Sequence, residues 1–447
     1  MKMHTDILII GSGAAGLFCA LQLPPQKKVL IVTKKKAEDS DSFLAQGGIC
    51  VLKSEEDYVS YFEDTMRAGH YENRTESVDL MLRSSRSVIE QLIALGVEFE
   101  QDNGELIYTK EGGHSDSRIL FHKDITGQEI TGRLLEQVRQ RDNIIIREDT
   151  TMVDLLEQDE ICHGAVVVTG DGTVCPVTAD YTILACGGVG GLYQHSTNYR
   201  HITGDALAVA IKHGIELENI DYVQIHPTTL YSEKPGRRFL ISESVRGEGA
   251  ILLNKKGERF VNELLPRDLL TREVRQQMER DAMPYVRLSM APIPKDTIIH
   301  HFPNIYSRCL EEGYDCTAEP IPVVPAQHYF MGGIHVDRNS CTSMGHLYAI
   351  GETSCNGVHG RNRLASNSLL ESLVFARRAA SHAATSYTSL PPLTREISPE
   401  ILKNLEELEE CSQNTVRNAI EQERMRKEHE SNYNAAECGS PDPSGTR

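Results

Sequence analysis

The sequence predicts an α/β protein with more than one domain, and three observations carry that prediction. An apolar run at residues 6–10 ends at Gly11 and is followed by an apolar segment and then by a second run at residues 29–32. Apolar runs that end directly in glycine recur at residues 181–188 and 347–352. The chain has 447 residues, which is more than one hydrophobic core usually supports.

The first of these runs opens a strand–turn–helix–strand unit. We expect residues 6–10 to form a buried strand, residues 14–23 a helix that a Pro-Pro pair ends, and residues 29–32 the next strand. This order is typical of the start of a doubly wound α/β domain. A further amphipathic helix is expected at residues 74–95, where apolar side chains recur at helical spacing.

A stretch of different character lies between the later strand signals. From residue 224 to residue 327 the periodicity is poor, and Arg, Pro and His are frequent. Because signals of a strand followed by glycine resume after this stretch, we expect residues 224–327 to be an inserted second domain. Residues 1–223 and 328–388 would then be the two parts of the first domain.

The last part of the chain, residues 389–447, is expected to be a separate helical segment with a disordered tail. Pro391 and Pro392 indicate a linker, and the final residues from Gly439 are rich in Gly, Pro and Ser. The apolar positions that can form one face of one or two helices are Ile401, Leu402, Leu405, Leu408, Val416 and Ile420.

Composition and charge exclude several classes of protein. With 40% hydrophobic and 25% charged residues, the chain has a globular and not a disordered composition. Its 46 basic and 64 acidic residues give a formal net charge of −18, which argues against nucleic-acid binding and against attachment to an acidic membrane surface. Apolar stretches are too short to span a membrane or to serve as a signal peptide. Eleven cysteines without a C-x-x-C pair favour reduced thiols in the cytoplasm over disulfides or a metal site.

The turn after the first strand carries a dinucleotide signal, Gly11-Ser12-Gly13-Ala14-Ala15-Gly16. In such a turn the first glycine permits the tight bend, the second lets backbone N–H groups approach a pyrophosphate, and the third lets the helix pack closely on the strand. The second strand leads into Thr33 and Lys34 without an acidic residue for a ribose hydroxyl, so the signal fits NAD poorly. Lys34 is able to meet a phosphate instead.

Three further motifs, read in order with this turn, resemble a known family. They are Gln46-Gly47-Gly48, His226-Pro227-Thr228-Thr229, and the run from Arg363 to Leu369. Over residues 6–384 the chain resembles the flavoprotein family of succinate dehydrogenase and fumarate reductase. The resemblance implies FAD in a Rossmann-like FAD-binding domain, with the inserted stretch as an α+β capping domain. The FAD contacts that it implies are Gly11, Ser12, Gly13, Ala14, Ala15, Gly16, Lys34, Ser42, Gln46, Gly47, Gly48, Asp205, Glu352, Ser368 and Leu369.

Two residues place the chain within that family. Members with covalently attached flavin carry a histidine where this chain has Asp41, so we expect non-covalent FAD and a soluble relative. Glu111 lies in a segment that resembles the branch acting on L-aspartate, whereas the enzymes that act on succinate have no acid there. A carboxylate in the pocket suits a substrate with an ammonium group and would repel succinate. Because the resemblance implies a larger helical bundle at this end, we expect the C-terminal segment here to be a shortened one.

The candidate active site combines arginine and histidine side chains in an acidic protein. An arginine offers a planar, charged fork to a carboxylate, so a small dianionic substrate is the natural partner. We expect Arg363 to bind one carboxylate, with His226 and His328 helping to hold the substrate. Ser242 stands where the family more often has threonine, and Arg267 matches the family's proton-transferring arginine. No metal site is expected.

The resemblance therefore implies oxidation of L-aspartate to iminoaspartate, with a hydride passing to FAD and a proton passing to Arg267. Oxygen or fumarate would be the electron acceptor, and quinolinate synthase would consume the product in the first steps of NAD biosynthesis. Two alternatives stay open: a soluble fumarate reductase or succinate oxidase, and a flavin-binding protein without turnover. Roles also stay open for five residues, namely Asp205 as a helix cap, Arg246, Arg361, His359 and His114.

Overall fold

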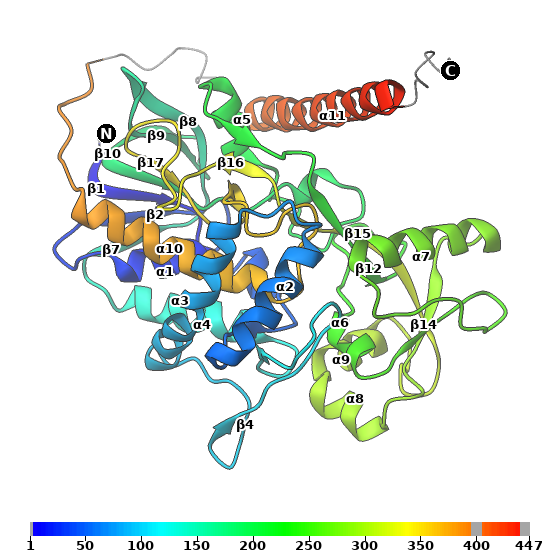
Figure 1. Cartoon of the computed structure of the whole chain (residues 1–447). Helices are drawn as coiled ribbons and strands as arrows, with labels where there is room; N and C mark the ends of the chain where they lie inside the picture. Colours follow the sequence, from blue (N-terminus) through cyan, green and yellow to red (C-terminus); the bar gives the residue numbers. More distant parts are fainter. Residues whose placement is uncertain (1–2, 395–404, 439–447) are drawn as a thin grey trace, which may run out of the picture.

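The computed structural model describes residues 3–394 and 405–438 of the chain, and a seven-stranded sheet forms its centre (Figure 1). The strand order is β7-β2-β1-β10-β9-β8, with β17 also paired to β10. Strands β7, β2, β1, β10 and β17 are parallel, and β9 and β8 extend the sheet in antiparallel fashion. The bounds are β1 Met3–Ile10, β2 Val29–Val32, β7 Ile144–Arg147, β8 Thr150–Gln158, β9 Ile161–Thr169, β10 Val174–Leu184 and β17 Leu347–Ala349.

Helices cover both faces of this sheet. Because successive residues of a strand point to opposite faces, Ile7 and Ile9 of β1 pack on one side and Leu8 and Ile10 on the other. The first side holds α1 (Ala14–Gln22), α3 (Thr75–Ala94), α4 (Thr126–Arg139) and α10 (Asn367–Thr385). The second side holds α5 (Asp205–Lys212). The predicted α/β fold class, with its strand–turn–helix–strand opening, is confirmed.

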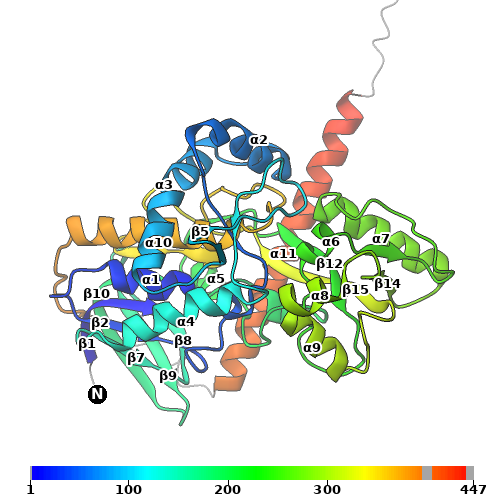
Figure 2. The same cartoon turned by 90° about the horizontal axis from the view of Figure 1, so that it is seen from below.

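A second unit stands beside this domain, drawn in green at the right of Figures 1 and 2. Its antiparallel sheet has the order β12-β15-β14-β13, with a hydrophobic core of its own. The predicted capping range 224–327 falls on this unit, although β15 runs to Phe330. The elements are β12 Val223–Leu230, β13 Ile251–Leu253, β14 Val286–Ser289, β15 Ile321–Phe330, α6 Glu243–Gly247, α7 Arg267–Asp281, α8 Lys295–His301 and α9 Pro303–Glu311.

The C-terminal segment contains one long helix, α11 (Leu405–Cys438). It lies against α5, and Val416 and Ile420 are 1% and 5% exposed in the core on the second side of the main sheet. The contact continues to Lys427, whose Nζ lies 2.7 Å from Asp221 Oδ1. Beyond Lys427 the helix extends away from the body of the molecule (Figures 1 and 2). Residues 391–392 have no regular secondary structure, as expected of a linker. Ile401, Leu402 and the tail from Gly439 lie outside the described residues.

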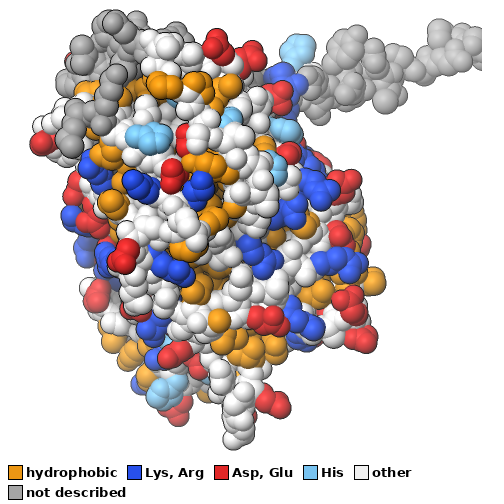
Figure 3. Space-filling view, turned by 90° about the vertical axis from the view of Figure 1, so that its left-hand side faces the viewer, with side chains coloured by type: hydrophobic (Ala, Val, Ile, Leu, Met, Phe, Trp, Pro, Cys, Tyr) orange, Lys and Arg blue, Asp and Glu red, His pale blue; other side chains and the backbone are white. Residues whose placement is uncertain are grey.

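The remaining elements, apart from α2, are short, and their strands form small two- and three-stranded sheets. They are α2 Tyr58–Ala68, β3 Ile49–Cys50, β4 Gln101–Asp102, β5 Glu105–Leu106, β6 Ile119–Leu120, β11 Leu217–Glu218, β16 Gly333–His335, β18 Ser354–Cys355, and the 3-10 helices η1 Asp41–Leu44, η2 Glu55–Asp57, η3 Gly190–Leu192 and η4 Gly351–Thr353. On the face shown in Figure 3, basic and acidic side chains are interspersed. Within the described ranges, every helix is too short or too polar to cross a lipid bilayer.

Candidate functional site

One elongated cavity lies at the carboxyl ends of β1, β2 and β10 and continues beneath the second sheet. In an open parallel sheet, ligands bind at this edge of the strands. Every predicted site residue lines the cavity except Ala14 and Gly16. Both of these belong to the glycine-rich turn, so the cavity unites the predicted cofactor residues with the predicted substrate residues.

The glycine-rich turn is built as the motif predicts. Gly11 has a φ of +117°, and a Cβ there would lie 2.0 Å from the carbonyl oxygen of Ala185 in the neighbouring strand. A Cβ on Gly16 would lie 2.2 Å from the carbonyl oxygen of Gly11, so the helix packs directly on the turn. The Ala14 N–H donates to Ser42 Oγ at 3.1 Å, and Ser12 Oγ donates to Thr33 Oγ1 at 2.9 Å. The turn is thereby tied to the end of β2 and to the segment that carries Ser42.

Lys34 follows β2 and lies between two carboxylates. Its Nζ is 3.0 Å from Asp205 Oδ2 and 3.2 Å from Glu409 Oε1 of α11. Although burial opposes it, the charges of these two carboxylates hold the pKa of Lys34 above its usual value. Asp205 is the first residue of α5, and Gly204 occupies the N-cap position, so the reading of Asp205 as a cap is wrong. Distant segments thus bring two carboxylates to Lys34, and its ammonium group is paired with both of them.

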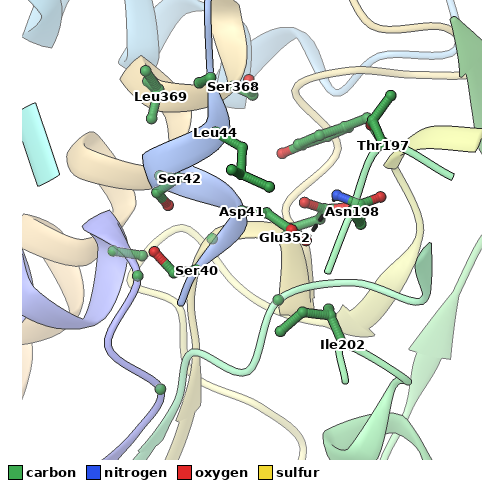
Figure 4. Close-up of a pocket in the computed structure, with 18 of the residues that line it drawn as sticks. Ser40, Asp41, Ser42, Leu44, Thr197, Asn198, Ile202, Glu352, Ser368 and Leu369 are labelled. Atoms are coloured by element: carbon green, nitrogen blue, oxygen red, sulfur yellow. Dashed lines mark hydrogen bonds between the residues drawn. The ribbon is translucent and has the colours of Figure 1, made fainter. Parts of the chain in front are cut away.

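Asp41 lines the cavity, at the position where the resemblance implies a histidine in members with covalent flavin. It points toward Asn198, as Figure 4 shows: Asn198 Nδ2 donates to Asp41 Oδ2 at 2.7 Å, and the Tyr199 N–H donates to Oδ1 at 2.8 Å. Removal from bulk water raises the pKa of Asp41 to about 6, against the effect of these hydrogen bonds. A carboxylate in this environment offers no ring nitrogen for a covalent link to flavin.

Glu352 is a second carboxyl group with a raised pKa on the cavity wall (Figure 4). It accepts a hydrogen bond from the Phe330 N–H at 2.9 Å. Removal from water, followed in size by the charge of Asp41, raises the pKa of Glu352 to about 8. A neutral carboxylic acid can donate a hydrogen bond as well as accept one, which suits a polar cofactor.

The residues present fit FAD. Within the described part of the chain, Gln46 Oε1 and Ser40 Oγ are buried without a hydrogen-bond partner, and both residues line the cavity. A Cβ on Gly13 would lie 3.2 Å from Ser42 Oγ, so glycine at this position avoids a tight contact beside the turn. Buried polar atoms are normally hydrogen-bonded, and a polar cofactor would satisfy these.

Glu111 faces the cavity from the loop between β5 and β6 and is 4% exposed. Ser244 Oγ donates to its Oε1 at 2.7 Å, and Ser366 Oγ donates to its Oε2 at 2.7 Å. A Cβ on Gly47 would approach Oε1 to 2.9 Å, so glycine at this position makes room for the carboxylate. Glu111 is therefore a fixed, buried carboxylate that a cationic ligand group would complement.

Arg267 begins α7 and is 7% exposed. Its Nε donates to Glu243 Oε2 at 2.7 Å, and its Nη1 donates to Gln224 Oε1 at 2.8 Å. Burial opposes ionisation of Glu243, but the charges of Arg267 and Arg246 hold the pKa of Glu243 below its usual value. Gln224 in turn donates from Nε2 to the carbonyl oxygen of Arg363 at 2.8 Å. The two arginines are thus held in a fixed relation to one another.

Arg363 is 4% exposed, and its guanidinium lies 4.6 Å from the ring centroid of Tyr329. Its Nη1 donates to Ser368 Oγ at 2.9 Å, whereas its Nε is buried without a partner among the described residues. Burial, and then the charge of Arg267, lowers the pKa of Arg363 to about 10, so it stays charged at neutral pH. A buried cation with an unused N–H group is a site for a carboxylate.

His226 and His328 form an edge-to-face pair, with ring centroids 5.2 Å apart. Burial, reinforced by Arg267, holds the pKa of both rings well below the usual range, so both are neutral. His328 Nδ1 lies 2.8 Å from Thr197 Oγ1. His226 Nε2 is buried with no partner in the described ranges, which leaves it available to a ligand. Neutral imidazoles add hydrogen bonds without adding charge to a cavity that Arg237, Arg267 and Arg363 already line.

Ser242 and the residues whose roles were open occupy different environments in the structure. Ser242 lines the cavity and caps α6, because its Oγ accepts the Ser244 N–H at 3.2 Å. Arg246 is buried and donates to the backbone of Glu263, while Arg361 is an exposed surface residue 3.8 Å from Glu72. His359 is buried beside Tyr329 and does not line the cavity.

Three polar side chains that hold the site are not apparent from the sequence: Gln224, Glu243 and Ser366. Glu243 directly follows Ser242, and an acid is expected wherever two buried arginines meet, so a charge argument could have found it. Gln224 and Ser366 are neutral, and the contacts of Gln224 with Arg363 and of Ser366 with Glu111 each join residues more than a hundred positions apart. Ser366 lies inside the motif from Arg363 to Leu369, but neither that motif nor the sequence around Gln224 indicates these contacts.

Comparison with known proteins agrees with this geometry. A family model described as an FAD binding domain matches residues 6–369. The L-aspartate oxidase of Clostridium perfringens is 52% identical over 381 residues, which are 85% of this chain and 87% of that protein. The chain belongs to the L-aspartate oxidase family. A second member, from Clostridium acetobutylicum, is 48% identical over 85% of this chain and 88% of its own length.

Solved structures relate the L-aspartate oxidase family to the fumarate reductases. The FrdA chain of a mutant E. coli quinol fumarate reductase superposes with a TM-score of 0.81 and 28% identity. The superposition covers 94% of this chain and 74% of that chain. The resemblance inferred from the motifs is therefore confirmed at the level of family, fold and FAD cofactor. The matched FAD-binding model ends before α11, which contributes Glu409 next to Lys34.

Proposed function

We propose that this protein oxidises L-aspartate to iminoaspartate with FAD, as the first step of NAD biosynthesis through quinolinate. The observation that carries the proposal is the charge arrangement in the cavity. Glu111 presents a buried carboxylate between two serine hydroxyls, while Arg267 and Arg363 present buried cations. An amino acid with two carboxylates and one ammonium group complements this set of charges, and a plain dicarboxylate does not.

Each part of the substrate has a partner on the chain. Arg363 binds one carboxylate through its unused N–H group, and His226 and His328 hold the substrate by hydrogen bonds. Glu111 accepts from the ammonium group. Because all these side chains are fixed by neighbours, substrate binding requires little reordering, which lowers its entropic cost.

The bound FAD supplies the two-electron acceptor for a hydride from the substrate carbon. We assign to Arg267 the role of accepting the proton that leaves the substrate. An arginine is protonated throughout the working pH range, so Arg267 can accept a proton only if it releases one. Glu243 Oε2, 2.7 Å from Arg267 Nε, is the group able to receive it. We therefore propose Arg267 and Glu243 as a proton-transferring pair.

Oxygen or fumarate then removes the electrons from the reduced cofactor. The structural likeness to quinol fumarate reductase favours fumarate, which would enter the cavity that aspartate leaves. A cytoplasmic location, away from membranes and nucleic acid, is part of the proposal. So is a functional link to quinolinate synthase, because iminoaspartate is unstable in water and a nearby consumer would limit its loss.

Anaerobic mixing tests the substrate directly. The purified yellow protein is mixed with L-aspartate, and separately with succinate, while the flavin absorbance is followed. Bleaching by L-aspartate alone is the expected result. Bleaching by succinate alone would instead support the soluble succinate oxidase, and retained yellow colour with both would support a flavin-binding protein without turnover.

The same experiment on Glu111→Gln tests the selecting residue. The amide keeps the size of the side chain and removes the negative charge that attracts the ammonium group. We expect the rate of bleaching by L-aspartate at low concentration to fall about a hundredfold. The ratio of the bleaching rate with succinate to that with L-aspartate should therefore rise. An unchanged preference between the two substrates would remove Glu111 from the substrate site.

A further inference from the structure

His114 lies three residues after Glu111 and points away from the cavity into a buried cluster. The backbone N–H of His114 donates to the carbonyl oxygen of Glu111 at 3.3 Å, which closes a turn. The turn includes Gly113 at a φ of +84°. The position of the Glu111 side chain is therefore linked by three residues of backbone to the position of the His114 ring.

The cluster beneath the turn fixes the protonation of His114. Arg118 Nη1 donates to His114 Nδ1 at 3.1 Å, so Nδ1 is the acceptor nitrogen. In a neutral imidazole the other nitrogen then carries the hydrogen, and His114 Nε2 donates to the carbonyl oxygen of Ala365 at 3.0 Å. Burial lowers the pKa of His114 to about 4, so the ring is neutral in the physiological range.

Arg118 is itself immobilised. Its side chain is fully buried, and it donates to Asp64 Oδ2 at 2.7 Å and to Asp57 Oδ1 at 2.9 Å. Asp64 Oδ2 also accepts from the Ser115 N–H and from Ser115 Oγ, each at 2.7 Å. The turn from Glu111 to Ser115 is thus anchored to α2, which carries Asp64. A buried ion pair with all its hydrogen bonds made is rigid.

The acceptor of the His114 hydrogen bond belongs to the other substrate loop. Ala365 lies between Arg363, the proposed carboxylate-binding residue, and Ser366, whose Oγ donates to Glu111 Oε2 at 2.7 Å. His114 therefore closes a ring of contacts: Glu111 to Ser366 by hydrogen bond, Ser366 to Ala365 by chain, and Ala365 to His114 by hydrogen bond. The ring joins the loop of Glu111 to the loop of Arg363.

We propose that His114 is a positioning residue for substrate selection, which fixes the separation between the Glu111 carboxylate and the Arg363 guanidinium. An amino acid must meet both groups at once, whereas succinate needs only the cationic side of the pocket. The separation therefore affects L-aspartate more than succinate. This inference rests on the proposed function, because it assigns Glu111 to the ammonium group.

Two polar variants test the positioning without opening a cavity lined by apolar groups. In His114→Gln the amide nitrogen can reach the Ala365 carbonyl oxygen in place of Nε2. In His114→Asn the side chain is one carbon shorter and cannot reach it. We expect His114→Asn to lower kcat/KM for L-aspartate about 10- to 100-fold, mainly through KM, and to change kcat/KM for succinate less than about threefold. His114→Gln should restore most of the loss.

His346→Gln is the matched control, because His346 Nδ1 also contacts a backbone carbonyl oxygen, that of Asp180 at 2.7 Å, away from the cavity. FAD content and melting temperature are measured for every variant. A role limited to folding would lower the melting temperature and leave the preference for L-aspartate over succinate unchanged. That result would overturn the proposal. Equal preferences in His114→Asn and His114→Gln would overturn it too, because only the glutamine can keep the hydrogen bond to Ala365.

A double-mutant cycle separates this proposal from the function on which it rests. If His114 acts through Glu111, then His114→Asn in a Glu111→Gln background should cause no further change in the preference between the two substrates. Additive changes would overturn the coupling. If Glu111→Gln alone leaves the preference unchanged while His114→Asn alters it, the assignment of Glu111 to the ammonium group fails and His114 acts through Arg363.

Discussion

Arg267 shows how the chemistry of a side chain depends on its neighbours. A lone arginine makes a poor base, but Arg267 donates from Nε to Glu243 Oε2 at 2.7 Å, so a buried carboxylate lies beside it to receive a proton. The pair can pass a proton from substrate to Glu243 without leaving an uncharged arginine. Removal of the guanidinium should therefore affect turnover far more than cofactor binding.

We expect Arg267→Leu to retain FAD and to lose at least about a hundredfold in kcat, since proton transfer by a positioned group typically contributes that much or more. The measurement is steady-state turnover of L-aspartate, with flavin content from the visible spectrum. Arg272→Leu on the same helix is the control, because that side chain is 63% exposed. Turnover near the level of the control would contradict the proton-transfer role.

Arg363 is expected to act on binding. In Arg363→Leu the substrate loses a buried cation that faces its carboxylate, and truncation of one partner of such a pair usually costs about 2 kcal/mol or more. We expect KM for L-aspartate to rise about a hundredfold, with a smaller change in kcat. Arg361→Leu, two residues away and 66% exposed, should behave as the unchanged protein. Equal KM values for the two variants would place Arg363 outside the substrate site.

At the scale of single residues, the sequence motifs predict which side chains line the cavity better than they predict the contacts that hold those side chains. The residues with a chemical signature, such as Glu111, Arg267 and Arg363, all line one cavity, as their motifs predict. Gln224 and Ser366 hold those residues in place, Glu409 pairs with Lys34, and all three come from segments far from their partners in the chain. A hydrogen bond between distant segments leaves no local pattern, so sequence alone could not indicate them.

Among the elements, apolar periodicity predicts the first and third helices and the second strand well. The first helix, the second strand and the helix at Thr75–Ala94 lie within one or two residues of the predicted bounds, because each has a continuous or periodic apolar face. The antiparallel strands β8 and β9 are not apparent from the sequence. Strand β8 contains buried Asp154, whose partners Lys212 and His213 come from the end of α5 and the residue after it. A charged residue inside a strand interrupts the apolar pattern by which the strand would be predicted, and the sequence does not show that distant partners neutralise the charge.

Helix α11 leads to a prediction about stability. Ile420 is 5% exposed and anchors the helix to the core beside α5. We expect Ile420→Ala to lower the free energy of unfolding by about 2–4 kcal/mol, since the truncation removes buried methyl groups and leaves a cavity. Met425→Ala on the same helix, where the side chain is 54% exposed, is the control. Urea unfolding of the two variants compares them, and equal stabilities would show that α11 is not docked.

Several histidines are buried in the molecule, and their burial predicts how its stability changes at acidic pH. Burial, reinforced by Arg363, holds the pKa of His359 well below its usual range. An unfolded histidine binds a proton near pH ~6.5, so below that pH the unfolded state binds more protons than the folded state. The contribution of His359 is therefore fully present above about pH 6.5 and is lost as the pH falls further.

We expect His359→Gln to reduce the loss of stability on acidification by up to about 1.4 kcal/mol per pH unit below about pH 6.5. Glu352, with its pKa raised to about 8, changes stability in the opposite direction, losing it as the pH rises. That effect is common to both proteins and cancels in the difference. Urea unfolding of the apoprotein between about pH 5 and about pH 7.5 supplies the comparison. Parallel pH profiles for the two proteins would contradict the prediction.

Asp41 has a consequence for the protein as it exists in a cell. Since no covalent bond holds the flavin, the loaded fraction of the protein is set by mass action with free FAD. Freshly made chains would become active without a separate attachment reaction, and their activity would follow the supply of riboflavin-derived cofactor. The step that begins synthesis of one redox dinucleotide would in this way be regulated by the abundance of another.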